Sequence, residues 1–213
     1  MLKSKQVWMM MGDYVYSSPA LLDDTVYFGG SEGLYALDIQ TGEEKWLFET
    51  ENPVQSPAIG DDGTIYFGSK DPALYAVDAQ TGELQWKNDE LVNPAGWTWN
   101  MSPGTTIADG LVYAAIADTT SGGVLRFFFA VRADTGELVW RFLFKGSDWS
   151  SVAAAEGIVY FGGGSSKNVL AVDAQTGEEL WSFQTEGTVH STPVVDNGVV
   201  YVGSLDGHLY ALN

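Results

Sequence analysis

The chain has 213 residues, 45% of them hydrophobic and 13% aromatic, so it can bury a substantial core and is not disordered as a whole. Its 28 acidic and 10 basic residues give a formal charge of -18, which disfavours nucleic acid and anionic membranes because their phosphates would be repelled. Without cysteine it has no disulfides or thiol nucleophiles, and no apolar run reaches the roughly 18 residues needed for membrane insertion.

The first unit, residues 14–50, sets a pattern that the rest of the chain repeats. A Ser-Pro segment is followed by the apolar run Val26–Gly30, by a second run that ends at Asp38, and by a third around Trp46. The runs are short, rich in Val, Tyr, Phe and Trp, and separated by Asp, Asn and Gly. These features predict four antiparallel strands, A to D, rather than helices.

Four further units follow the same order. The repeat is marked by the motif A-x-D-x-x-T-G-E-x-x-W, with Arg132 replacing the Asp in one copy; the copies are Ala36–Trp46, Ala76–Trp86, Ala130–Trp140 and Ala171–Trp181. One four-stranded sheet of about 40 residues cannot bury both of its faces, so neighbouring units must stack. The sequence therefore predicts an all-β, five-bladed β-propeller in a single domain, 1–213, with blades at 14–50, 54–88, 98–144, 149–185, and 189–213 plus 3–11.

The two ends of the sequence complement each other. The last unit stops at Asn213, the position of Asp38 in the first unit, and joining Asn213 to Met1 would place Trp8 at the spacing of the complete motif. We therefore predict that residues 3–11 supply strand D of the last blade and close the ring of a monomer. Deletion of residues 1–11 is then expected to cause aggregation.

In these motifs the chain resembles the PQQ-like repeat propellers, also called quinoprotein-dehydrogenase-like, over essentially its whole length. The resemblance implies a structural girdle of docking tryptophans between the blades: Trp8, Trp46, Trp86, Trp140 and Trp181. It implies function only loosely, because the family includes quinone-dependent dehydrogenases, the propeller lipoprotein of the outer-membrane assembly machinery and sensor domains of bacterial kinases. Rings of this family usually have more blades than five.

The third unit departs from the repeat by two insertions. Leu91–Pro103 lengthens the connection from strand D to strand A, and Ala117–Val124 lengthens that from B to C. In a propeller both connections emerge on the same face. Trp97 and Trp99 in the first insertion are candidates either for a lid over the central opening or for a hydrophobic clamp that ties the insertion down.

A second departure lies at the start of strand A, nearest the central channel. Equivalent positions there hold unlike residues, which we name the inner ring positions: Tyr16, Gln55, Asn100, Trp149 and His190. Aromatic faces and hydrogen-bonding groups around a concavity suit a polar ligand with an apolar face, such as a sugar or a heteroaromatic ring. The alternative is that these side chains plug a narrow channel.

Neither a metal nor another cofactor is predicted. The two histidines, His190 and His208, have no metal-site spacing, and the Asp-Gly and Asn-Gly segments lie at turns between strands A and B, where their backbone preferences explain them.

Three functions remain open at this stage. The first is a non-enzymatic scaffold for a small ligand or a partner protein, possibly a sensor module of a larger protein. The second is a structural repeat excerpt or design without a selected ligand, which the near identity of Asp78–Trp86 and Asp173–Trp181 suggests. The third, a quinone-dependent dehydrogenase, follows from the resemblance alone. We do not expect it, because the chain has no cysteine pair and does not align with the cofactor sites of those enzymes.

Overall fold

The computed structural model describes residues 8–9, 15, 17–70, 73–91, 99–101, 104–118, 125–145 and 151–213. These residues form only strands and turns, arranged as five antiparallel sheets that follow one another along the chain. Across the described ranges there is no helix of the length and apolarity required to cross a membrane. The all-β class and the count of five blades are thus confirmed.

Each sheet is built from strands that are consecutive in sequence, in the order A, B, C, D. The first contains β1 (Ala20–Leu22), β2 (Thr25–Gly29), β3 (Gly33–Asp38) and β4 (Glu44–Glu49), and the second contains β5 (Ala58–Ile59), β6 (Thr64–Gly68), β7 (Leu74–Asp78) and β8 (Leu84–Asn88). The third contains β10 (Thr106–Ala108), β11 (Leu111–Asp118), β12 (Leu125–Arg132) and β13 (Leu138–Lys145), and β9 (Trp99–Met101) also pairs with β11. The fourth contains β14 (Ala153–Ala155), β15 (Ile158–Gly162), β16 (Asn168–Asp173) and β17 (Glu179–Gln184), and the fifth contains β18 (Val194–Asp196), β19 (Val199–Gly203) and β20 (Leu209–Leu212).

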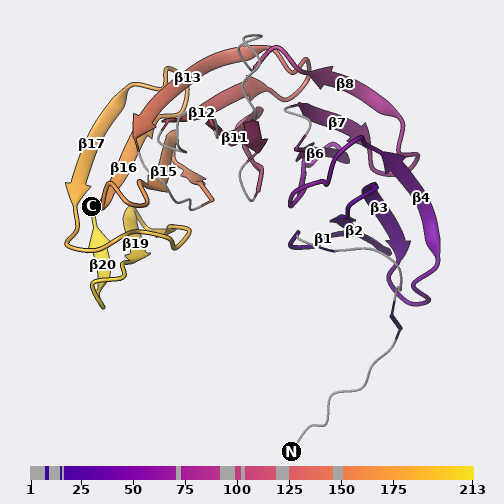
Figure 1. The fold of residues 1–213 in the computed structure, drawn as a ribbon, viewed down its shortest axis with the longest axis horizontal. Helices are drawn as coiled ribbons and strands as arrows, with labels where there is room; N and C mark the ends of the chain where they lie inside the picture. The colour runs from indigo at the N-terminus through magenta and orange to yellow at the C-terminus, as the bar shows by residue number, and fades with distance from the viewer. Residues whose placement is uncertain are drawn as a thin grey trace, which may run out of the picture.

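The five sheets stand side by side around an open arc, with β4, β8, β13 and β17 on its outer side (Figure 1). The innermost strands of successive sheets contact one another, β1 with β5, β5 with β10, β10 with β14 and β14 with β18. The first and last sheets stand at the two ends of the arc (Figure 1).

The segment expected to close the ring, residues 3–11, lies outside the described residues except for Trp8 and Met9. Among the described residues β20 pairs only with β19, so the last sheet has three strands. Trp8 lies on the first blade: its indole N–H donates to the carbonyl of Ile39 at 3.0 Å, and its ring covers Gly42. Trp8 thus occupies the place that the tryptophan of a preceding blade would take, while the sheet of that blade is not beside it.

Neighbouring blades are joined by a tyrosine and a tryptophan that share one acceptor. Tyr27 and Trp46 lie in one row of the first sheet, with their rings 5.7 Å apart. The Tyr27 hydroxyl and the Trp46 indole N–H both donate to the carbonyl of Ala79 in the next blade, at 3.0 and 3.1 Å. Polar groups inside an apolar interface need such partners, and the two bonds therefore fix how one blade sits on the next.

The later blades repeat this joint. Trp86 donates to the carbonyl of Ala133 at 2.8 Å, and Trp140 donates to that of Ala174 at the same distance. Burial in the interface, with smaller effects of the nearby Asp109 and Asp173, raises the pKa of Tyr113 to about 12.

The Thr-Gly step of the motif gives the tryptophan its docking surface. Gly82 has a φ of +72°, and a Cβ placed there would lie 2.9 Å from the Trp46 ring. Glycine is therefore needed for the left-handed backbone and for the close approach of the indole.

The motif aspartate holds the turn that carries this glycine. The Asp78 carboxylate accepts hydrogen bonds from the backbone N–H groups of Gln80 and Thr81 at 2.9 and 2.8 Å, and from the Thr81 hydroxyl at 3.0 Å. The backbone N–H of Thr81, its hydroxyl and the N–H of Gln80 lower the pKa of Asp78, against a smaller opposing effect of burial. The hydrogen bonds of this turn join residues close in sequence, which is why the turn could be predicted from spacing alone.

Replacing Asp78 with Ala is expected to lower Tm by about 2–4 °C at pH 7, because the loss of such a capping carboxylate costs about 1 kcal/mol. The pKa of Asp78 is lower in the folded state, so its contribution is complete above the ordinary value of 3.8 and disappears as pH falls through the folded-state pKa. Thermal unfolding of both proteins between pH 7 and pH 2 should show the two Tm values converging at low pH. The matched control is Arg132→Ala, at the same motif position of the third blade, where no carboxylate is lost. Equal Tm values of wild type and Asp78→Ala at pH 7 would contradict the assigned role.

Candidate functional site

Two of the inner ring positions have described side chains, Gln55 and His190. They directly follow the buried residues Val54 and Val189, and each valine donates its backbone N–H to the loop after strand B of the preceding blade, at 3.0 and 3.3 Å. Gln55 and His190 are therefore equivalent, as we expected despite the shorter second unit. Gln55 is half-buried and His190 is exposed. Tyr16, Trp97 and Trp149 lie outside the described residues, and Trp99 and Asn100 are described by their backbone in β9.

The strand register shifts Asn100 away from the inner ring positions. Met101 pairs with Ile116, as Val54 pairs with Ser69. Ile116 and Ser69 occupy the same place in their blades. Met101 is thus the equivalent of Val54, so Asn100 lies one residue before it, whereas an inner ring position lies one residue after. The cause is a shorter segment before β10: Pro103 lies only two residues after Met101, whereas Pro193 lies four residues after Val189, so the proline no longer marks the register.

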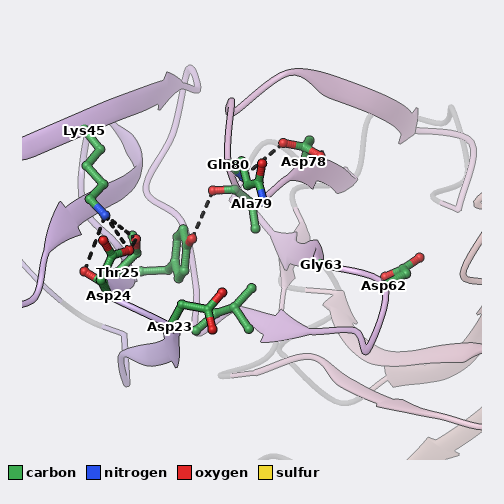
Figure 2. Close-up of a pocket in the computed structure, with 11 residues that line it drawn as sticks. Asp23, Asp24, Thr25, Lys45, Asp62, Gly63, Asp78, Ala79 and Gln80 are labelled. Atoms are coloured by element: carbon green, nitrogen blue, oxygen red, sulfur yellow. Dashed lines mark hydrogen bonds and ion pairs between the residues drawn. The ribbon is translucent and has the colours of Figure 1, made fainter.

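A groove of about 380 Å³ lies between the first and second blades (Figure 2). Three of its charged side chains, Lys45, Asp24 and Asp62, form hydrogen bonds within their own blades. Lys45 Nζ lies 2.7 Å from Asp24 and donates to the Thr25 hydroxyl at 2.8 Å, and the hydrogen bond between Lys45 and Asp24 is the main reason that the pKa of Lys45 is raised and that of Asp24 lowered. Asp62, across the groove, accepts from the backbone N–H of Thr64 at 3.0 Å.

The groove recurs between the second and third blades with a volume of about 330 Å³. Its walls are again turns between strands A and B, with Asp61, Asp62 and Asp109. A search of the described ranges finds no group of three or more His, Cys, Asp or Glu residues placed to hold a metal ion. Because equivalent grooves lie between successive blades, we attribute them to the packing of one blade against the next.

The most distinctive surface is the outward side of the last sheet, which we call the end face: Val194, Tyr201, Leu209 and Ala211. In the other blades the same side of the sheet is covered by the next blade. The tyrosines there that correspond to Tyr201 are at most 5% exposed: Tyr27, Tyr66, Tyr113 and Tyr160. Tyr201 is 39% exposed. Leu209 is 74% exposed, whereas its equivalents Leu34 and Val169 are completely buried. The end face is thus an interface of the usual composition without a covering blade.

Beside the end face lies a second unfilled feature, which we call the seat. It is a shallow groove of about 340 Å³ between the fourth and fifth blades, lined by Trp181, Ser182, Phe183 and Ala211–Asn213. A fourth strand alongside β20 would run here. Within the described ranges the indole N–H of Trp181 has no acceptor, whereas the other four motif tryptophans each donate to a carbonyl.

The last sheet is firmly anchored despite its missing strand. Asp206, in the turn before β20, accepts from the backbone N–H groups of Glu186, Gly187 and His208 and from the Tyr210 hydroxyl, all at 3.0 Å. Burial opposes ionisation of Asp206, but the hydrogen bonds outweigh it and hold the pKa of this carboxyl well below its usual range. The strands that carry the end face are therefore held in place by the hydrogen bonds of Asp206.

Stacked four-stranded sheets with this strand order define a β-propeller architecture. The family model described as "Outer membrane protein assembly factor BamB" matches residues 3–128 and 128–213. The chain therefore belongs to this family of PQQ-like repeat propellers. No curated protein matches the sequence.

Solved structures share the fold at low sequence identity. BamB from Moraxella catarrhalis is 18% identical with a TM-score of 0.71, over 95% of this chain and 63% of that one. Quinohemoprotein alcohol dehydrogenase from Comamonas testosteroni is also 18% identical, with a TM-score of 0.74 over 94% and 41% of the two chains. The computationally designed Ika8 protein is 18% identical, with a TM-score of 0.69 over 91% and 57%. The chain thus spans less than two thirds of each of these structures.

Proposed function

We propose that this chain is a non-enzymatic propeller scaffold that acts through protein contacts at its end face. The observation that carries the proposal is the exposure of Tyr201 and Leu209 at positions that are buried in every other blade. An exposed apolar surface of this kind, on a sheet that Asp206 holds in place, is typical of protein interaction sites.

The family relationship leaves room for two kinds of role, since one structural neighbour is a BamB and another is an alcohol dehydrogenase. We favour the interaction role because charged groups of the first interblade groove already have partners: Lys45 pairs with Asp24, and Asp62 accepts from the backbone N–H of Thr64. The enzymatic alternative is tested by adding the quinone cofactor, calcium and an alcohol to a dye-reduction assay. Turnover above the level without protein would overturn the non-enzymatic part of the proposal.

A photo-reactive amino acid in place of Leu209 tests the interaction role directly. Illumination in an extract of the native host is expected to give one discrete crosslinked product. The matched control places the same group at Leu84, which is 50% exposed on the outer strand β8 and belongs to no unfilled interface. If both positions give the same pattern, or neither gives a product, the end face is not an interaction site.

A small ligand at the inner ring positions stays a prediction. Gln55 and His190 support it in that they stand at equivalent places, one half-buried and one exposed.

A further inference from the structure

The seat requires a particular kind of occupant. The β20 strand has a free backbone edge in the described structure, and the groove next to it is floored by Trp181 and Phe183. An unpaired strand edge recruits another extended segment, because its N–H and C=O groups lack partners. An occupant that also covers the end face must bring a whole blade with it.

The chain contains a docking tryptophan, Trp8, that has no sheet of a preceding blade beside it among the described residues. Trp8 docks on the first blade as Trp46 docks on the second: its indole N–H donates to the Ile39 carbonyl, and its ring lies 2.7 Å from the place of a Cβ on Gly42. In each complete joint the docking tryptophan belongs to strand D of the preceding blade. Trp8 therefore takes the position of a strand D tryptophan, whereas the last sheet has no strand D among the described residues.

We propose that the end face and the seat bind the first blade and the N-terminal segment around Trp8 of a second copy of this chain, in a head-to-tail assembly. This inference rests on the proposed function and names its partner. The first blade, which holds Trp8, and the last sheet stand at opposite ends of the arc (Figure 1), so a contact between them within one chain requires the arc to close, whereas a contact between two chains does not. Contacts between unlike surfaces of two identical chains are heterologous and extend in one direction.

The repeat sets the register of this contact. In all four complete blades the motif tryptophan lies opposite an alanine: Ala36 and Trp46, Ala76 and Trp86, Ala130 and Trp140, Ala171 and Trp181. The corresponding alanine of the last sheet is Ala211, which pairs with Tyr201. Trp8 of the second copy is therefore placed opposite Ala211, and Met10 of that copy opposite Leu209.

The same register completes the joint. In the first joint Tyr27 and Trp46 share the carbonyl of Ala79. By analogy, Tyr201 of the first copy would donate to the Ile39 carbonyl of the second copy, which already accepts from Trp8 of that same second copy. Charge favours the contact as well. Residues 1–11 contain two lysines and no acidic residue, while the chain as a whole carries a charge of -18.

The absence of cysteine makes a crosslinking test simple. A Met10→Cys protein and a Leu209→Cys protein of different tag length are mixed and oxidised. We expect a mixed disulfide dimer, and no dimer from the control mixture of Met10→Cys with Leu84→Cys. Leu209 is exposed, so its substitution leaves the fold of the free chain intact.

A second measurement does not depend on the disulfide. By light scattering, the mass of the unmodified chain should rise with concentration to twice 23.1 kDa or more. Both deletion of residues 1–11 and Leu209→Lys should return it to that of one chain. Circular dichroism of the two variants checks that they are folded.

Two results would overturn the inference. One is a disulfide within a single chain of a Met10→Cys/Leu209→Cys double variant, with no mixed dimer from the single variants, which would mean that the chain closes on itself. The other is a monomer at all concentrations without a mixed dimer. A photo-crosslink from Leu209 to a different protein in that case would keep the proposed function and reject only the second copy.

Discussion

Replacing Trp140 with Ala is expected to lower the free energy of unfolding by about 3–5 kcal/mol, the usual cost of truncating a buried aromatic residue, and Tm by about 6–20 °C. Trp140 is 7% exposed, contacts Tyr113 with ring centroids 6.0 Å apart and donates to the Ala174 carbonyl at 2.8 Å. Its removal leaves a cavity between the third and fourth blades, and the Ala174 carbonyl keeps only the long hydrogen bond of 3.5 Å from the Tyr113 hydroxyl. Thermal and urea unfolding measure the effect.

The matched control is Trp181→Ala, which truncates the same motif position one blade later. Trp181 is half-buried, and its indole N–H has no acceptor in the described part of the chain. At protein concentrations where the chain is monomeric, this substitution should cost clearly less than Trp140→Ala. Equal losses would mean that docking on the next blade adds little to the stability of the joint.

Replacing Gly177 with Ala is expected to have the second large effect. Gly177 has a φ of +71°, and an added Cβ would lie 2.6 Å from the Trp140 ring, so the substitution combines backbone strain with overpacking. We expect a loss of about 2–5 kcal/mol, of which about 1–2 kcal/mol is the cost of the left-handed backbone and about 1–3 kcal/mol is overpacking. Urea unfolding of the variant measures the loss.

Gly157→Ala separates these two contributions. Gly157 has a φ of +76° and no atom within 4 Å of an added Cβ, so it reports the backbone cost alone. The excess loss at Gly177 should disappear in the Trp140→Ala background, where no ring opposes the new methyl group. An excess that persists there would place the clash elsewhere.

Those features of the fold that each repeat specifies within itself could be predicted from the sequence. The turn that Asp78 holds depends on contacts between residues close in sequence, and the glycine under each indole, although distant from that indole along the chain, recurs at a fixed place in the motif. The five sheets follow from the same pattern.

Closure could not be predicted in the same way. Whether residues 3–11 reach the last sheet depends on the curvature of the arc, which accumulates from small rotations between blades that no motif encodes. The contact of Trp8 with Ile39 is local to one joint and does not depend on this curvature.

The candidate site was predictable only in part. Gln55 and His190 are equivalent because a buried valine precedes each, a signal that survives the one-residue deletion in the second unit. Asn100 was misplaced because the proline that served as a guide, Pro103, lies closer to the anchor Met101 than the corresponding prolines of the other units lie to theirs, so counting back from it passed the anchor. The end face was missed because the exposure of Tyr201 and Leu209 arises from a missing neighbour, and their own residue types look like those of any other blade.

The docking tryptophans give the arc a polarity. Trp46, Trp86 and Trp140 each belong to a strand D and donate to the turn of the blade that follows, so these joints point the same way along the chain. An array of such units therefore has two chemically different ends, one presenting a turn to be covered and the other presenting an indole that needs a turn. An array of blades joined in this manner can be extended through these joints only head to tail, as in a polar filament. Two like ends cannot form the joint, because they offer two turns or two indoles and not one of each.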